Sequence, residues 1–309
     1  MDASELVAAL PADCVQMRDA ILARGLPPVW QLDAETARAL HLEGNLMARA
    51  AWEPPVDALP VDMESGHIDG RIPVRTYRHR DRETGITIAW LHGGGWVLGG
   101  LETADAICRT ICDATGHAVV SVDYRCAPWH PFPAAADDCV DAVGHLLDSG
   151  ARVVVAGDSA GGTLAAVCAQ RLGGTARLAA QVLLYPATDP ALRSASAHAF
   201  VEGPFLTRRD MEWFYDQYLP EDLRRDPRAD LTGPVGAGAR VPAVVVTVGH
   251  DPLRDEGIAY AQALADAGGA VTWLHAPELY HGSLTQAGVL PSARARLAEA
   301  LAALRALLD

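Results

Sequence analysis

The sequence predicts an α/β protein in which a mostly parallel sheet carries helices on both faces. From residue 86 onward, short apolar runs alternate with segments of helical length. Most of these runs are apolar on both faces, as covered parallel strands are, and a repeated strand–helix–strand order builds a parallel sheet. One antiparallel hairpin should precede them, because residues 61–79 alternate polar and apolar side chains around Asp69–Gly70, a hairpin-type turn.

The core elements follow in a regular order along a single predicted domain, residues 1–309. We expect strands at 86–92, 118–125, 152–158, 180–186, 242–249 and 270–277. Helix-period apolar positions fill the intervals and predict helices at 102–115, 134–148, 160–172, 254–267 and 292–308.

Two further segments predict a helical cap. Residues 1 to about 50 carry helix-period apolar positions interrupted by prolines, which indicates short helices that pack on another part of the chain. About 55 residues separate the strands at 180–186 and 242–249, whereas one crossover needs about a dozen. This interval is too aromatic for a solvated loop. We therefore expect about 1–50 and about 190–235 to form a cap over the carboxyl edge of the sheet.

Composition excludes several classes of function. The net charge of −14 opposes binding to nucleic acid and to anionic membrane surfaces, which need clustered cations. All 25 basic residues are arginines, so Schiff-base chemistry, a lysine base and a phosphate-loop lysine are excluded. The six cysteines lack a histidine pair at metal-ligand spacing and are expected as buried thiols. We find no secretory n-region and no apolar stretch of about 18 residues, so we expect a soluble cytoplasmic protein without a membrane span.

Residues 157–161 (GDSAG) predict a nucleophilic serine. They follow the apolar strand at 152–158 and open the helix at 160–172. In such a turn Ser159 takes a strained backbone conformation, and small residues two positions away prevent clashes. The free N–H groups of the helix that begins at Ala160 favour negative charge at the site. This context favours a nucleophile over an incidental serine in a glycine-rich turn.

The run His92-Gly93-Gly94-Gly95-Trp96 directly follows a predicted strand and predicts an oxyanion-binding loop. Glycines let backbone N–H groups approach a ligand, and losing one oxyanion donor typically costs about 2.7–4 kcal/mol. A phosphate-binding loop is excluded, because neither glycine-rich phosphate motif fits the run. His92 is expected to brace the loop by hydrogen bonding.

A serine nucleophile needs a base. Of the eleven histidines, His281 is best placed, because it lies in a loop after the last predicted strand. His275 lies inside that strand, and His250 lies ahead of the loop that follows its own strand.

The base in turn needs an orienting acid. Asp251 starts the turn after the strand at 242–249, and the chain order serine, acid, histidine fits this type of nucleophile turn. Asp189, after the preceding strand, is the competing acid. Asp158 adjoins the serine along the chain and is expected to brace the turn.

Five motifs make the chain resemble the hormone-sensitive-lipase-like family of α/β-hydrolases, in the form of bacterial carboxylesterases with a GDSAG motif. They are HGGGW (92–96), DYRCAPWHPFPAAADD (123–138), GDSAGG (157–162), DPLRDEG (251–257) and YHGS (280–283). The resemblance implies an α/β-hydrolase fold with a helical cap over the pocket. It also implies a catalytic triad of Ser159, Asp251 and His281, and an oxyanion hole formed by N–H groups of the Gly93–Gly95 loop and of Ala160.

The chain departs from the family at two positions. The family commonly has a glutamate where Trp129 stands, and often a bulky apolar residue where Ser283 stands. Neither position belongs to the implied triad, and both bear on the shape of the pocket.

The resemblance implies a serine carboxylic-ester hydrolase, esterase- or lipase-like, that forms an acyl-enzyme and requires no metal or organic cofactor. Its partners would be a small-molecule ester and water, and a homodimer is compatible with the sequence. We expect bulky pocket walls, which predict short-to-medium acyl esters as substrates over long-chain triglycerides. These walls are Trp96, Phe205, Leu206 and Trp213.

Other functions remain open at this point. An amidase, a lactonase or a thioesterase would use the same serine chemistry. A non-catalytic small-molecule receptor on the same fold would be favoured by loss of a triad residue, and all three are present. A dinucleotide-binding oxidoreductase would need a glycine fingerprint that the chain lacks.

Overall fold

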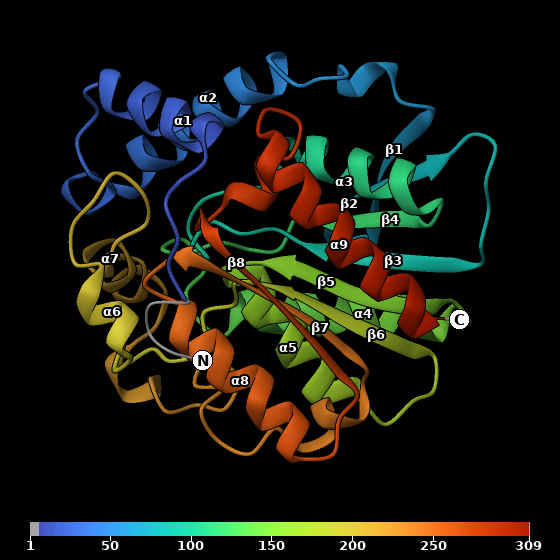
Figure 1. Cartoon of the computed structure of the whole chain (residues 1–309). Helices are drawn as coiled ribbons and strands as arrows, with labels where there is room; N and C mark the ends of the chain where they lie inside the picture. The colour runs from blue at the N-terminus through green and yellow to red at the C-terminus, as the bar shows by residue number, and fades with distance from the viewer. Residues whose placement is uncertain (1–5, 309) are drawn as a thin grey trace.

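The computed structural model describes residues 6–308, and its centre is one eight-stranded sheet with the order β1-β2-β4-β3-β5-β6-β7-β8 (Figure 1). The strands are β1 (Val61–Ile68), β2 (Ile72–His79), β3 (Ile86–Leu91), β4 (Ala118–Val122), β5 (Arg152–Asp158), β6 (Leu178–Leu184), β7 (Ala243–His250) and β8 (Val271–Tyr280). β2 pairs antiparallel with both β1 and β4, while every other pair is parallel. The predicted mostly parallel α/β sheet with a leading hairpin is confirmed.

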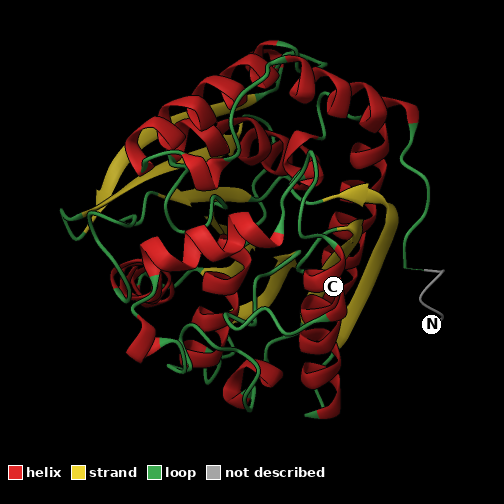
Figure 2. Ribbon diagram, turned by 90° about the vertical axis from the view of Figure 1, so that its left-hand side faces the viewer, coloured by secondary structure: helices red, strands yellow, loops and turns green. Residues whose placement is uncertain are grey.

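Helices cover both faces of the sheet (Figure 2). They are α1 (Ala12–Ala23), α2 (Ala34–Ala50), α3 (Leu101–Thr115), α4 (Ala134–Asp148), α5 (Ala160–Leu172), α6 (Ala195–Ala199), α7 (Arg208–Tyr218), α8 (Arg254–Asp266) and α9 (Pro291–Leu308). The buried apolar side chains of α9, and those of α3 apart from Ala106, belong to one hydrophobic cluster, and those of α4, α5 and α8 belong to another. The two clusters therefore fill opposite faces of the sheet.

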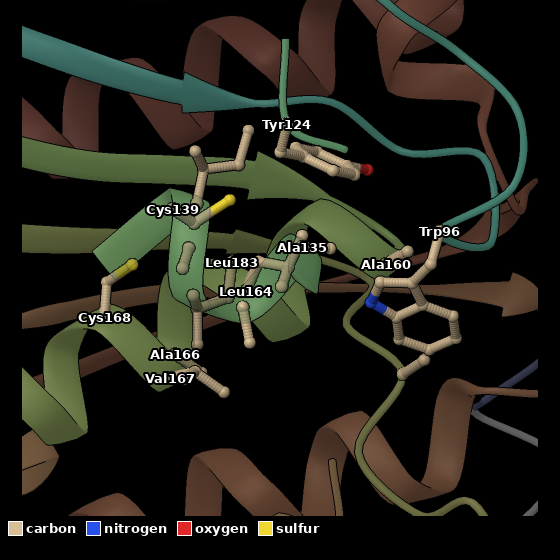
Figure 3. Packing of buried hydrophobic residues seen from close by; sticks show 14 of the residues in the cluster. Trp96, Tyr124, Ala135, Cys139, Ala160, Leu164, Ala166, Val167, Cys168 and Leu183 are labelled. Carbon is tan, nitrogen blue, oxygen red and sulfur yellow. The ribbon is translucent and has the colours of Figure 1, made fainter. Parts of the chain in front are cut away.

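Strand β5 shows why the central strands are apolar throughout. Val153 and Val155 pack in the cluster that contains α4 and α5, while Val154 and Ala156 pack in the cluster that contains α3 and α9. All four are at most 3% exposed. Figure 3 shows part of the first cluster, where side chains of α4 and α5 meet the sheet. Because alternate residues of a strand point to opposite faces, a strand covered on both sides must be apolar at every position.

The predicted core strands and helices are all present, and their ends differ from expectation by a few residues. β8 continues to Tyr280 instead of ending at 277, because a register shift after Val248 lets His250 pair with Tyr280. β4 ends at Val122, and beyond it the ring of Tyr124 leaves the ladder to stack on His92. Neither difference changes the topology.

The N-terminal helices and the segment with α6 and α7 lie toward the end of the sheet where the parallel strands finish (Figure 1). The loop after β3 meets α7 there, because the Trp96 ring stacks on Tyr218 with ring centroids 4.6 Å apart. The N–H of Phe132 also donates to the Tyr218 carbonyl at 2.8 Å. Over residues 6–308, no helix has both the length and the apolar character needed to cross a membrane.

Candidate active site

Ser159 occupies a sharp turn between β5 and α5. Its backbone angles are φ 54° and ψ −122°, a conformation that residues with a side chain rarely adopt. The Ser159 N–H donates to the Leu184 carbonyl at 2.8 Å, which holds the turn against β6. A Cβ atom on Gly161 would overlap the carbonyl oxygen of Leu91 at the end of β3. The strands on either side thus pack directly against the turn, and the serine stands at their carboxyl ends.

Three side chains from different loops form a continuous hydrogen-bonded chain. His281 Nε2 lies 2.9 Å from Ser159 Oγ, and His281 Nδ1 lies 2.8 Å from Asp251 Oδ2. A carboxylate can only accept, so Nδ1 carries the proton and Nε2 is free to accept the serine hydroxyl proton. The Asp251 side chain is fully buried, and its Oδ1 accepts the Leu253 N–H at 2.8 Å. This geometry allows the imidazole to act as a base toward Ser159.

The imidazole is also held by its surroundings. The backbone N–H of His281 donates to the backbone carbonyl of His250 at 3.2 Å, so β7 and β8 together position the loop that carries the imidazole. The His281 ring packs against Tyr185, with centroids 4.7 Å apart. Gly282 follows in a left-handed conformation at φ 85°, which turns the chain away immediately after the histidine.

The competing side chains are engaged elsewhere. His250 Nε2 donates to the Ala8 carbonyl at 2.8 Å, and His275 Nε2 donates to the Leu6 carbonyl at 3.0 Å. Asp189 forms a two-oxygen pair with the Arg193 guanidinium, at 3.0 Å for each bond. Of the two acids weighed from the sequence, Asp251 is the one hydrogen-bonded to the imidazole of His281.

The glycine loop after β3 is fastened at its first residue. The Gly93 N–H donates to Asp158 Oδ1 at 2.8 Å. His92 Nδ1 donates to the Gly93 carbonyl at 2.8 Å, and the His92 ring stacks on Tyr124 with centroids 4.2 Å apart. The Tyr124 hydroxyl donates to the His92 carbonyl at 2.7 Å. His92 and Asp158 therefore both brace the loop.

This fastening leaves a defined set of backbone N–H groups without an acceptor. Among the described residues, the N–H groups of Gly94, Gly95 and Ala160 donate to no backbone or side-chain acceptor. The Gly93 N–H, which was one of the candidates, is already bound to Asp158. Gly94 and Gly95 have φ angles of 113° and 60°, and a Cβ on Gly95 would overlap the Phe214 ring. Only glycine satisfies both conditions at position 95.

Burial shifts the pKa values of the two side chains that brace the loop, Asp158 and His92. Burial raises the pKa of Asp158 to about 6, although its hydrogen bond from Gly93 and the nearby His281 act in the opposite direction. Burial lowers the pKa of His92 to about 4. His92 is therefore neutral at pH 7 and can present a single fixed N–H to Gly93, while Asp158 is mainly ionised and accepts from the Gly93 amide.

The aromatic residues predicted as pocket walls occupy different surroundings. Trp96 is 2% exposed and stacked on Tyr218. Phe205 stacks on Tyr280 with centroids 3.9 Å apart. Trp213 meets the Phe214 ring edge to face at 5.2 Å, and Leu206 is partly buried against the core.

Phe214 is an aromatic side chain that directly abuts the glycine loop after β3, since its ring fills the space beside Gly95. Sequence reasoning placed Phe214 in the aromatic interval but did not assign it to the site. The helical spacing of the apolar residues in α7 could have indicated that Phe214 faces inward. This helix buries Met211, Phe214, Tyr215 and Tyr218.

The thiols take no part in this arrangement. Cys14, Cys108, Cys112, Cys126, Cys139 and Cys168 are all free and buried. Within residues 6–308, no group of three or more His, Cys, Asp and Glu side chains is arranged to hold a metal ion.

The chain is similar to known proteins over most of its length. A family model described as alpha/beta hydrolase fold matches residues 88–285. The carboxylic ester hydrolase LipN of Mycobacterium tuberculosis is 38% identical over 91% of this chain and 83% of its own length. The ethyl acetate hydrolase of Pseudomonas putida is 36% identical over 86% of this chain and 88% of its own length.

Solved structures show the same likeness. An ester-hydrolase from the metagenome of Lake Arreo, solved with a bipyridine phosphonate derivative, has a TM-score of 0.85 and 36% identity, covering 96% of this chain and 98% of the other. A thermostable esterase of Pseudomonas putida has a TM-score of 0.86 and 29% identity, covering 97% of this chain and 98% of the other.

Proposed function

This chain belongs to the alpha/beta hydrolase fold family and is a carboxylic ester hydrolase, and we propose that it cleaves its esters at Ser159 in two acyl-transfer steps. Its resemblance to the hormone-sensitive-lipase-like family is thereby confirmed. The observation that carries the proposal is the continuous hydrogen-bonded chain from Ser159 Oγ through the His281 imidazole to Asp251.

In the first step Ser159 Oγ attacks the carbonyl carbon of the ester, while His281 Nε2 takes the hydroxyl proton. The carbonyl oxygen becomes an oxyanion, and the unengaged N–H groups of Gly94, Gly95 and Ala160 are the donors that would stabilise it. The bond to the alcohol oxygen then breaks. The same imidazole gives its proton to the leaving alcohol, and the acyl group remains on the serine.

In the second step a water molecule attacks the acyl carbon while His281 takes one of its protons. The second tetrahedral intermediate collapses, the acid is released, and the proton returns to Ser159 Oγ. Asp251 stabilises the imidazolium that forms in both steps, because its carboxylate faces Nδ1 and is shielded from water. No step draws on a cofactor.

We further propose that the N-terminal segment to about residue 50 and the segment at about 190–235 act as a cap that limits the length of the acyl group. The support is the packing of aromatic side chains from α7 against the loop after β3, with Phe214 beside Gly95 and Tyr218 on Trp96. With Phe205, Leu206 and Trp213 as further walls, short-to-medium acyl esters fit better than long chains.

The intracellular location also remains a proposal. A reducing cytoplasm is supported by the six cysteines, each a buried thiol without a disulfide partner in the described chain.

Hydrolysis of nitrophenyl esters by the Ser159→Ala variant tests the proposal. We expect kcat to fall by several orders of magnitude, since removing a triad nucleophile in a serine hydrolase costs about 10⁶-fold. Ser149→Ala, which alters an exposed hydroxyl at the end of α4, is the matched control and should keep wild-type kcat. A fluorophosphonate probe should label the wild type and not Ser159→Ala. Unchanged turnover in Ser159→Ala, or a rate that peaks at palmitate in a chain-length series, would refute the respective proposal.

A further inference from the structure

We infer that Arg38, on the N-terminal helix α2, is a positioning residue that holds the Gly94 and Gly95 amides in their orientation. Arg38 Nη1 donates to the Val97 carbonyl at 2.6 Å, and Nη2 donates to the Gly99 carbonyl at 3.2 Å. One half-buried guanidinium thus bridges two carbonyls of the oxyanion loop. This inference rests on the proposed function, because it assigns a role relative to the oxyanion donors.

The carbonyls of Val97 and Gly99 belong to the part of the loop that follows Gly93–Gly95 in the chain. The Gly94 carbonyl accepts the N–H groups of both Val97 and Leu98, at 3.1 and 2.8 Å, so the loop forms a tight turn directly after the donor amides. Holding the carbonyl of Val97 therefore also holds the peptide planes on the other side of the turn. Arg38 acts at the point where the turn closes.

Gly99 packs the end of the loop against its start at His92 and Gly93. A Cβ atom on Gly99 would lie 2.5 Å from His92 Nδ1 and 2.7 Å from the Gly93 carbonyl oxygen. The backbone at Gly99 is therefore in direct contact with the residues that precede the donors. With Asp158 bound to the Gly93 amide and Arg38 bound to the Gly99 carbonyl, the loop is clamped at both ends.

The environment of Arg38 directs its N–H groups to these carbonyls. Among the described residues no carboxylate forms an ion pair with Arg38. The Trp129 ring lies 5.7 Å from its Cζ, and an aromatic face attracts a guanidinium without taking its N–H donors. The Arg38 N–H groups thus remain available to the Val97 and Gly99 carbonyls.

Helix α2 has other attachments, so loss of the Arg38 head group should not release it. Ala34 and Ala37, near its start, are buried in the hydrophobic core. At the opposite end, Arg49 Nε pairs with the buried Asp105 at 3.1 Å. Variants at Arg38 are therefore expected to fold, and effects on turnover can be separated from effects on the helix.

Steady-state hydrolysis of nitrophenyl acetate by Arg38→Met and Arg38→Lys tests the inference. We expect Arg38→Met to lower kcat by about 10–100-fold with KM within about threefold, because displaced donors weaken transition-state binding more than substrate binding. Arg38→Lys should fall between, since an ammonium does not bridge two carbonyls with fixed geometry. Arg24→Met, which removes an N-terminal pair with Glu43 at 3.3 Å and does not touch the loop, should match the wild type.

Chemical rescue separates a positioning role of Arg38 from a purely structural one, because added guanidinium would not restore kcat if Arg38 only stabilised the fold. Guanidinium chloride at a non-denaturing concentration should restore part of the kcat of Arg38→Ala, while sodium chloride at equal ionic strength should not. Wild-type kcat in both Arg38→Met and Arg38→Lys, or an equal loss in Arg24→Met, overturns the inference. The proposed function fails separately, when the wild type hydrolyses no ester or when Ser159→Ala is as active as the wild type.

Discussion

The imidazole of His281 lies 2.8 Å through Nδ1 from Oδ2 of Asp251, whose side chain is fully buried. The two residues come from the loops after neighbouring strands β7 and β8. Asp251 has a second fixed bond, from the Leu253 N–H to Oδ1, so the carboxylate cannot rotate away. The pair therefore determines which imidazole nitrogen faces Ser159.

Asp251→Asn should lower kcat by about 10³–10⁴-fold while leaving KM nearly unchanged. An amide cannot stabilise the imidazolium, and it can favour the tautomer in which Nε2 carries the proton and no longer accepts from serine. Ester hydrolysis at saturating substrate, measured near pH 8, gives kcat.

Asp189→Asn is the matched control for that substitution. Asp189 is a buried carboxylate in the loop that follows the neighbouring strand β6, but it pairs with Arg193 and not with a histidine. We expect a lower melting temperature and a kcat within about threefold of wild type. A larger loss of kcat in Asp189→Asn than in Asp251→Asn would rule out Asp251 as the orienting acid.

Asp158→Asn should stabilise the protein at alkaline pH. Burial raises the pKa of Asp158 from 3.8 to about 6, so between these pH values the folded state holds a proton that the unfolded chain has released. Stability therefore falls as the pH rises through this window, and the full deficit remains above pH 6. Asparagine does not ionise and still offers Oδ1 to the Gly93 N–H.

The free energy of unfolding by urea, measured at pH 5 and at pH 8, checks this expectation. The gain of Asp158→Asn over the wild type should be on the order of 1–3 kcal/mol at pH 8 and smaller at pH 5. Asp62→Asn, on the exposed edge strand β1, serves as the comparison. A gain that is equal at both pH values would contradict the ionisation argument.

Gly161→Ala should destabilise the fold far more than Gly162→Ala, although both residues lie in the first turn of α5. The new methyl group at 161 would overlap the Leu91 carbonyl oxygen, a backbone atom of β3 that cannot move without shifting the sheet. We expect a loss of about 3 kcal/mol or more. At 162 the nearest atom is Pro186 Cβ, 3.2 Å away, so the change should stay within about 1 kcal/mol. Urea denaturation of the two variants, measured in parallel, tests this expectation. Similar midpoints would contradict the predicted overlap with the Leu91 carbonyl oxygen.

Phe214→Ala should shift the substrate preference toward longer acyl chains. The Phe214 ring occupies the space beside Gly95, and removing it enlarges the site next to the proposed oxyanion donors. The ratio of kcat/KM for nitrophenyl octanoate to that for nitrophenyl acetate should rise several-fold. Phe200→Ala, which removes a cap ring packed near His250 instead, should leave the ratio unchanged. An unchanged ratio in Phe214→Ala would place the acyl group elsewhere.

The fold could be predicted from the amino-acid pattern alone, because the signals for strands and helices are local along the chain. A strand buried on both faces must be apolar at each position, and a helix shows its period of 3.6 residues, so the strands and helices from residue 86 onward could be predicted nearly to their ends. The strand–turn–helix context of Ser159 and the glycines after β3 are local as well. They predict a nucleophile and a donor loop, and the family membership that the comparisons confirm followed from the same motifs.

Which residues from distant parts of the chain meet in the site could not be predicted in this way. The bond from Gly93 to Asp158, which removes one of the three loop amides from the available donors, joins residues 65 positions apart. The choice between Asp251 and Asp189 as partner of His281, the placement of Phe214 beside Gly95, and the reach of Arg38 to the Gly99 carbonyl depend likewise on packing between separate segments. Such contacts are set by side-chain direction and distance across the folded core, and no periodicity along the chain records them.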